Sequence, residues 1–209
     1  MPGYLSLSIF VKMDHPLNIP YQIILGSQSP RRKELLTGMG IDFEVKVIPT
    51  SEDFDLEWGP AKIATMLAVQ KGNCFEKMTR DNNNLLVITA DTIVSINDQI
   101  LNKPASKEEA FSMIKTLSGN MHTVYTGVCI TTAGKQEAFV SSTDVYFNEL
   151  NDEEINYYIE KYQPFDKAGS YGVQEWIGYI GIQRIEGCFF NVMGLPVNEL
   201  YKRLKKYSD

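Results

Sequence analysis

Residues 21–40, YQIILGSQSPRRKELLTGMG, join a short apolar segment to a helix through a serine-rich turn. The apolar segment predicts a buried strand, because it is short, continuous and followed directly by turn residues. Ser29 is placed to cap the helix, Pro30 suits its first position, and Gly38 and Gly40 end it. The stretch therefore predicts a strand, a turn and a helix at the start of the folded region.

Strand and helix patterns alternate along the rest of the chain. Further strands are expected at residues 43–49, 85–96, 122–133, 136–147, 180–185 and 188–192, with a hairpin around Gly134. Further helices are expected at residues 59–78, 106–119, 151–162 and 196–206. This alternation predicts an α/β fold with a mixed sheet. We interpret residues 1–20 as a loose N-terminal extension and residues 21–209 as a single α/β domain.

The overall charge limits the partners of this chain. With 20 basic and 26 acidic residues, its formal charge is -6. An acidic surface repels nucleic acid polymers, whose affinity rests on neutralising phosphates, so no such partner is expected. A phosphate-binding site would have to be a local basic pocket.

The chain also carries no sign of export or of a membrane partner. No apolar run approaches the roughly 18 residues that a membrane-spanning helix needs. The apolar run near the N-terminus is neither preceded by a basic residue nor followed by a clean cleavage site, which argues against a secretory signal. Three cysteines lie far apart and form no CxxC motif, as expected for free thiols in a cytoplasmic protein: Cys74, Cys129 and Cys188.

Several common kinds of catalytic site are excluded by what the sequence lacks. There are two histidines, His15 in the extension and His122 in a predicted strand, which leaves little for a histidine-rich metal site or a Ser/His/Asp triad. The glycine-rich P-loop and dinucleotide-binding patterns do not occur. A general base in this chain is therefore expected to be a carboxylate.

The turn GSQSPRR is the clearest candidate for an anion site. Arg31 and Arg32 fall in the first turn of the predicted helix, where cations oppose the helix dipole. A bound anion would remove this conflict, and the free backbone N–H groups of the helix end would point toward it. The alternative is that both arginines are solvated and pair with Glu34 or other surface acids.

Acidic residues and a lysine elsewhere suggest where a reaction would take place. Asp91 directly follows an apolar run, at the position where open α/β sheets place their ligands, so it is a candidate base or metal ligand. The alternative is that Asp91 only caps or turns the chain before the next strand. Glu52 and Asp53 form a carboxylate pair of the kind that hard cations favour, or a solvated loop. Lys103, beside a proline in a predicted loop, is positioned to meet phosphate or is an ordinary surface lysine.

The loop at residues 166–174 combines two glycines with a terminal amide. Gly169 and Gly172 would let the backbone approach a ligand closely, and the amide of Gln174 suits recognition of a base edge. By itself this pattern has little specificity.

Taken in order, five segments resemble the motifs of the Maf family of nucleotide pyrophosphatases, and the resemblance spans residues 23–204. They are GSQSPRRKELL, ADTIV, LNKPAS, LSGNMHTVYTGV and FDKAGSYGVQ. The resemblance implies a Maf/ITPase-like fold with two lobes around a central cleft, helices on both sides of a twisted mixed sheet, and a homodimer. It also implies cleavage between the α and β phosphates of a nucleoside triphosphate with a divalent metal, Mg²⁺ or Mn²⁺.

The resemblance also assigns roles to individual residues. Ser27, Arg31 and Arg32 match the phosphate-binding turn, Lys103 matches a lysine before proline, and Asp91 matches the proton acceptor. Glu52 matches an acid after the second strand, which with Asp91 would bind the metal and take part in catalysis. Base specificity is associated with the positions of Arg31, Thr92 and Gln174.

The ending YGVQ is similar to the branch of the family that acts on dTTP and UTP, or on modified pyrimidine nucleotides, rather than the branch that acts on 7-methyl-GTP. Two positions depart from the usual pattern: Gly26 stands where alanine is common, and Ser51 stands where many relatives have a second acid before Glu52. A nucleotide-binding regulator of cell division without turnover is the alternative from another functional class.

Overall fold

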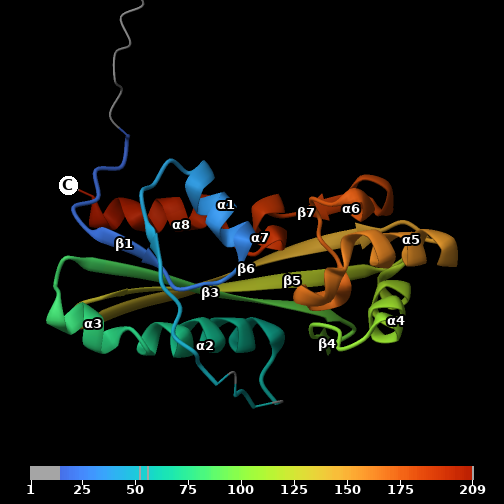
Figure 1. Ribbon diagram of the computed structural model, residues 1–209, viewed down its shortest axis with the longest axis horizontal. Helices are drawn as coiled ribbons and strands as arrows, with labels where there is room; N and C mark the ends of the chain where they lie inside the picture. The colour runs from blue at the N-terminus through green and yellow to red at the C-terminus, as the bar shows by residue number, and fades with distance from the viewer. Residues whose placement is uncertain (1–14, 52, 56, 209) are drawn as a thin grey trace, which may run out of the picture.

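A seven-stranded mixed sheet runs through the computed structural model, which describes residues 15–51, 53–55 and 57–208 (Figure 1). Its strand order is β2-β1-β3-β5-β6-β7, and β4 pairs with β3. β1 is parallel to β2 and β3, and the other pairs are antiparallel. The strands are β1 (Gln22–Leu25), β2 (Glu44–Val45), β3 (Leu85–Ile96), β4 (Gln99–Leu101), β5 (Met121–Thr132), β6 (Lys135–Phe147) and β7 (Ile182–Glu186).

Helices cover both faces of this sheet, as the sequence predicts. On one face lie α1 (Pro30–Gly38), α7 (Phe189–Met193) and α8 (Val197–Leu204), and on the other lie α2 (Pro60–Asn73) and α3 (Glu76–Asp81) (Figure 1). At one end, α4 (Lys107–Leu117) packs against α5 (Asp152–Tyr162), and α6 (Trp176–Gly181) precedes β7. Short 3-10 turns complete the chain at Pro164–Asp166, Ala168–Ser170 and Lys205–Tyr207.

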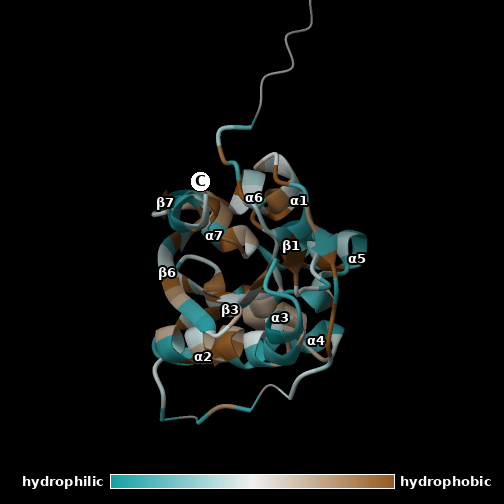
Figure 2. Ribbon diagram, turned by 90° about the vertical axis from the view of Figure 1, so that its left-hand side faces the viewer, coloured by the Kyte–Doolittle hydropathy of each residue, from teal (hydrophilic) through white to brown (hydrophobic). Residues whose placement is uncertain are grey.

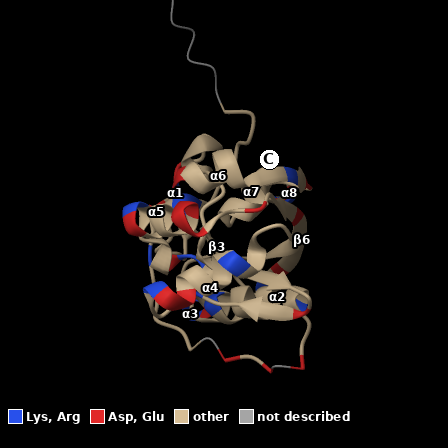
Figure 3. Ribbon diagram, turned by 90° about the vertical axis from the view of Figure 1, so that its right-hand side faces the viewer, with Lys and Arg blue, Asp and Glu red and all other residues tan. Residues whose placement is uncertain are grey.

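The apolar core lies between the sheet and its helices. Figure 2 shows hydrophobic colouring on β1 and in the middle of the molecule, whereas α3 and α5 on the outside are largely hydrophilic. Figure 3 shows acidic and basic residues side by side around α4 and α5. Two ion pairs of 2.7 Å join these helices, Lys107–Glu160 and Lys115–Asp152. No helix in the described parts of the chain is both long and apolar enough to cross a membrane.

Helix caps and the long hairpin follow the sequence closely. Ser29 accepts a hydrogen bond from the backbone N–H of Arg32, and Ser106 accepts one from Glu109. Asn151 and Glu154 form a capping box at the start of α5. β5 and β6 pair from Met121 to Thr132 across the predicted turn. The three helices begin at these residues because the capping side chains satisfy their first backbone donors.

The predictions around α2 and β2 were only partly correct. The predicted strand 43–49 is regular at Glu44–Val45 alone, and residues 47–50 instead line a cavity. The predicted helix 59–78 breaks after Asn73, and α3 begins at Glu76. Phe75 turns inward at the break and is 2% exposed. Burial of its ring stabilises the fold more than continuation of the helix would.

The predicted strand at residues 188–192 is wrong, because Phe189–Met193 is the helix α7. A short apolar run does not distinguish a strand from a buried helix. Asn191 is fully buried in α7, and its amide donates to the Val124 carbonyl and the Thr143 hydroxyl, both at 3.0 Å. The predicted strand at 180–185 starts at Ile182, because residues before it form α6.

Part of the predicted N-terminal extension packs on the domain. Leu17 is 7% exposed and belongs to the main core, and the ring of His15 lies 2.8 Å from the Met39 carbonyl. Residues 1–14 lie outside the described part of the chain.

His122 in β5 should make the stability of the protein depend on pH. Burial is the largest influence on its pKa and lowers it from 6.5 to about 4, although the charge of Asp144 acts in the opposite direction. Between these values the unfolded chain binds a proton and the folded chain does not, so stability is full above about pH 6.5 and falls toward pH 4. We expect this site to cost roughly 3 kcal/mol over that interval.

Denaturant unfolding between pH 7 and pH 4 would test this expectation. His122→Gln lacks the titrating ring, so its unfolding free energy should fall less steeply than that of the unchanged protein. Parallel curves for the two proteins would contradict the assignment.

Candidate active site

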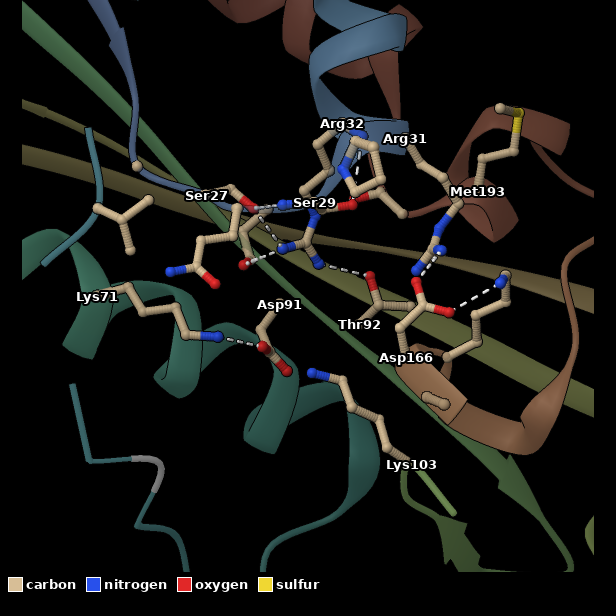
Figure 4. Close-up of a pocket in the computed structure, with 18 of the residues that line it drawn as sticks. Ser27, Ser29, Arg31, Arg32, Lys71, Asp91, Thr92, Lys103, Asp166 and Met193 are labelled. Carbon is tan, nitrogen blue, oxygen red and sulfur yellow. Dashed lines mark hydrogen bonds and ion pairs between the residues drawn. The ribbon is translucent and has the colours of Figure 1, made fainter. Parts of the chain in front are cut away.

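A cavity of about 470 Å³ lies over β3, beside the N-terminus of α1 (Figure 4). Its walls come from distant parts of the chain, including the turn before α1, residues 47–50, α2, β3 and the loop 166–174. Seven residues predicted from the sequence line it together: Ser27, Arg31, Arg32, Asp91, Thr92, Lys103 and Gln174. Glu52, the eighth predicted residue, lies outside the described residues.

Arg32 joins the walls of this cavity. Its guanidinium donates hydrogen bonds of 2.8 Å to the carbonyls of Ala90 and Gly194, and of 3.0 and 3.2 Å to the hydroxyls of Thr92 and Ser27. Arg32 is therefore committed to acceptors in the protein as well as lining the cavity. The sequence suggested an anion contact and gave no indication of this internal role.

Thr92 continues the same set of hydrogen bonds into the sheet. Its hydroxyl lies 3.0 Å from the hydroxyl of Thr126, directly opposite it on β5. Thr126 donates in turn to the Asn191 carbonyl of α7 at 3.0 Å. The three side chains Arg32, Thr92 and Thr126 thus connect α1, β3, β5 and α7.

Asp91 forms an ion pair with Lys71, whose Nζ lies 2.5 Å from Oδ1. The two side chains are 14% and 19% exposed, so solvent screens their attraction less than at an open surface. Figure 4 shows Lys103 reaching toward Asp91 from the other side. The carboxylate of Asp91 therefore lies between two lysines.

Lys71 was not predicted from the sequence, although the spacing of buried residues on α2 contains a signal for it. On α2, Ile63 and Leu67 are buried at a spacing of four residues, and Lys71 is the next position in that series. A basic residue that continues the buried face of a helix needs an acidic partner or ligand. α2 approaches the sheet at Gly127, opposite Asp91 on β5, where an added Cβ would lie 2.1 Å from the Ala64 carbonyl oxygen.

A second group of charges lies at the other side of the cavity. Arg31 pairs with Oδ2 of Asp166 at 2.8 Å, and Lys167 pairs with Oδ1 at 2.8 Å (Figure 4). Burial would raise the pKa of Asp166, but hydrogen bonds from Lys167 and Arg31 outweigh it and hold that pKa below its usual value. Asp166 therefore stays negative between two cations. The glycine-punctuated loop was recognised in the sequence, but this ion-pair cluster was not.

Gln174 lies at the border between this cavity and an apolar hollow beside α1, α6 and α7. Its Oε1 atom is buried and finds no hydrogen-bond partner among the described residues. Such an atom costs free energy unless a ligand or water satisfies it, which agrees with a binding role for the amide.

On the side of the cavity where Lys71 and Lys103 lie, the described residues supply one carboxylate that could bind a metal ion, that of Asp91. They contain no cluster of three or more His, Cys, Asp or Glu side chains that would hold an ion alone. Mg²⁺ bound with a nucleotide needs only one or two carboxylates, since phosphates and waters complete its shell. Asp91 fits this requirement, because Lys71 takes Oδ1 and the other oxygen faces the side of Lys103 (Figure 4).

The charge of the cavity is opposite to that of the whole chain. Among described residues, five basic side chains line it (Arg31, Arg32, Lys71, Lys103 and Lys167) against two acidic ones (Asp91 and Asp166), a net +3. The full chain carries -6. The fold and this cavity define an α/β protein with a pocket for a small, highly charged anion.

Comparison with known proteins identifies the family. The family model described as Maf-like protein matches residues 22–207, so this chain belongs to the Maf-like family. It is 52% identical over 190 residues to a Porphyromonas gingivalis protein named dTTP/UTP pyrophosphatase, covering 90% of this chain and 96% of that one. A Bacteroides thetaiotaomicron protein of the same name is 48% identical over 187 residues, covering 89% and 96%.

Among solved structures, the Ham1 protein of Staphylococcus aureus aligns with a TM-score of 0.48 and 14% identity. The alignment covers 88% of this chain and 98% of that one.

Gly26, which replaces the alanine expected from the resemblance, is explained by its neighbours. A Cβ at this position would lie 2.6 Å from Cγ2 of Thr89 and 3.0 Å from the Phe75 ring. We expect Gly26→Ala to destabilise the protein by about 1–3 kcal/mol through overpacking. Thr89→Ser removes the clashing methyl but keeps the hydroxyl that donates to the Ala68 carbonyl at 2.7 Å. Chemical denaturation should therefore show that the double variant regains stability relative to Gly26→Ala. Strictly additive losses would contradict this coupling.

Proposed function

We propose that the chain is a nucleoside triphosphate pyrophosphatase that hydrolyses dTTP and UTP, or modified pyrimidine nucleotides, to the monophosphate and pyrophosphate. The observation that carries this proposal is a cavity whose described lining residues carry a net charge of +3 and in which the Asp91 carboxylate lies between Lys71 and Lys103. Support for the substrates comes from the names of the relatives from P. gingivalis and B. thetaiotaomicron.

In the proposed reaction, Asp91 accepts a proton from a water molecule that attacks the α phosphorus. The bond from that phosphorus to the bridging oxygen breaks, and pyrophosphate leaves with the electron pair. Lys71 holds one oxygen of Asp91, which orients the carboxylate toward the water. Lys103 and the α1 N-terminus attract the phosphates, so the reaction depends on positioning and electrostatics.

A divalent metal, Mg²⁺ or Mn²⁺, belongs to the same proposal. Glu52 and Asp91 would either hold this ion or activate the attacking water, the two roles that the sequence assigns to them. When bound, the ion would supply further positive charge to the phosphates.

The opposite side of the cavity suits recognition of the base. Arg31 pairs with Asp166 and lies away from the pair of Lys71 and Asp91 (Figure 4). Gln174, at the end of the loop 166–174, lines the same cavity. An arginine and an amide both present directional donors to the edge of a base. We assign substrate discrimination to Arg31, Gln174 and Thr92, whose hydroxyl accepts a hydrogen bond from Arg32.

The proposal extends to a cytoplasmic homodimer. The three cysteines are free thiols, as in a reducing compartment, and the dimer rests on the family resemblance. Light scattering would measure the mass of the assembly directly.

Product analysis tests the reaction. Incubated with Mg²⁺ or Mn²⁺, the protein should convert dTTP and UTP to monophosphate and pyrophosphate faster than CTP, ATP or 7-methyl-GTP. EDTA should abolish turnover, and added metal should restore it. Orthophosphate with a nucleoside diphosphate would contradict cleavage at the α phosphorus. Binding without turnover would favour a nucleotide-dependent regulator.

Replacement of the proposed base gives a second test. Asp91→Asn keeps the shape of the side chain but removes its charge, so turnover should fall by roughly 10²- to 10⁴-fold, the range of a lost general base. Asp98→Asn is a matched control in the turn after β3, outside the cavity. Steady-state kinetics on UTP should show normal turnover for that control. An Asp91→Asn protein that turns over UTP at the normal rate would reject the role of Asp91.

A further inference from the structure

A buried tyrosine on α5 holds the loop that carries Gln174. Tyr158 is fully buried, and its hydroxyl donates a hydrogen bond to Oε2 of Glu175. The same hydroxyl accepts a hydrogen bond of 2.9 Å from the backbone N–H of Gly172. Gln174 lies between these two anchored positions, so the tyrosine restrains the backbone on both sides of it.

The hydrogen bonds continue from Glu175 to the wall of the cavity. Lys167, 8% exposed, lies with its Nζ 3.1 Å from Oε1 of Glu175 and 2.8 Å from Oδ1 of Asp166. The other oxygen of Asp166 binds Arg31 at 2.8 Å. One connected series therefore reaches from the core to the cavity: Tyr158, Glu175, Lys167, Asp166 and Arg31.

The groups in this series keep fixed donor and acceptor roles. Burial, followed by the hydrogen bond to Glu175, raises the pKa of Tyr158 far above its usual value, so the phenol remains a donor. Asp166 remains an anion because Lys167 and Arg31 overcome the effect of burial on its pKa. Each group can thus hold its neighbour in one orientation.

Gly172 is required for this arrangement. A Cβ there would lie 2.7 Å from the carboxyl carbon of Glu175, so a side chain would push that carboxylate away from Tyr158. The glycine lets Glu175 fold back over the loop and reach both the phenol and Lys167.

We propose that Tyr158 and Glu175 are positioning residues that set the substrate preference of the enzyme by holding Gln174 and Arg31. Neither residue is among those that line the cavity. Their effect passes through the loop backbone to Gln174, and through Lys167 and Asp166 to Arg31. This inference rests on the proposed function, because it concerns the base-recognising side of the same site.

Steady-state kinetics of Glu175→Gln and Tyr158→Phe would test the inference. The lost hydrogen bonds should raise KM for UTP about 3- to 10-fold, the effect of roughly one hydrogen bond. kcat should stay within about twofold, because Asp91 and Lys71 are untouched. The preference for UTP over ATP, measured as the ratio of their kcat/KM values, should fall by about the same factor as the KM for UTP rises.

Matched controls exist on the same helix. Tyr157→Phe removes an exposed phenol that contacts Lys161, and Glu160→Gln removes an exposed carboxylate that pairs with Lys107. Both should keep the KM and the substrate ratio of the unchanged protein. Glu175→Gln preserves side-chain shape, so it keeps the test valid if Tyr158→Phe fails to fold. Melting temperatures identify such a failure.

The outcomes separate this inference from the proposed function. The unchanged protein could turn over UTP while Glu175→Gln keeps its KM and substrate ratio. That result would overturn the inference and leave the proposed function standing. A fall in kcat with constant KM and constant ratio would indicate loss of folded protein and would also overturn it. If the unchanged protein neither binds nor hydrolyses a triphosphate, the proposed function fails and the inference fails with it.

Discussion

The cavity depends first on the guanidinium of Arg32. This group binds the Ala90 carbonyl of β3, the Gly194 carbonyl after α7 and the hydroxyls of Ser27 and Thr92. Hydrogen bonds from a charged donor contribute about 1.5–3 kcal/mol each, more than neutral ones. Because their acceptors are far apart in sequence, these bonds hold the N-terminus of α1 over the middle of β3. Arg31, the next residue on α1, is placed at the cavity by the same helix end.

The opposite wall depends on close packing of α2. Gly127 on β5 lets the Ala64 carbonyl approach the sheet, and Gly72 lies over Thr131, where an added Cβ would be 2.8 Å from the hydroxyl oxygen. Lys71, next to Gly72, is thereby brought to Asp91. Two physical requirements are met here. The backbone needs room to approach the sheet, and a half-buried lysine needs a counter-charge. The close packing of α2 against the sheet thus places Lys71 beside Asp91.

Local patterns allowed much of the fold to be predicted. Caps such as Ser29, Ser106 and Asn151 act within one helical turn, so their sequence signals are sufficient. The segment Phe189–Met193 was mistaken for a strand because its helical state depends on the burial of Asn191 among β5 and β6. The break at Phe75 likewise depends on a distant packing partner. Such tertiary effects leave little trace in local periodicity.

Sequence motifs named residues that lie together in one cavity, but they did not reveal the long-range pairs between them. Ser27, Arg31, Asp91 and Gln174 line one cavity as expected. The pairs Lys71–Asp91 and Arg31–Asp166 join residues that are 20 and 135 positions apart, and only the folded chain reveals them. The internal role of Arg32 is of the same kind, since its partners include Gly194.

A crystal structure with a UTP analogue that carries an imido group between the α and β phosphates would test the central claim most directly. We expect the triphosphate in the cationic cavity, with the α phosphorus facing Asp91 and the β and γ phosphates near Lys103 and the start of α1. A triphosphate bound outside the cavity, or a γ phosphorus facing Asp91, would contradict it.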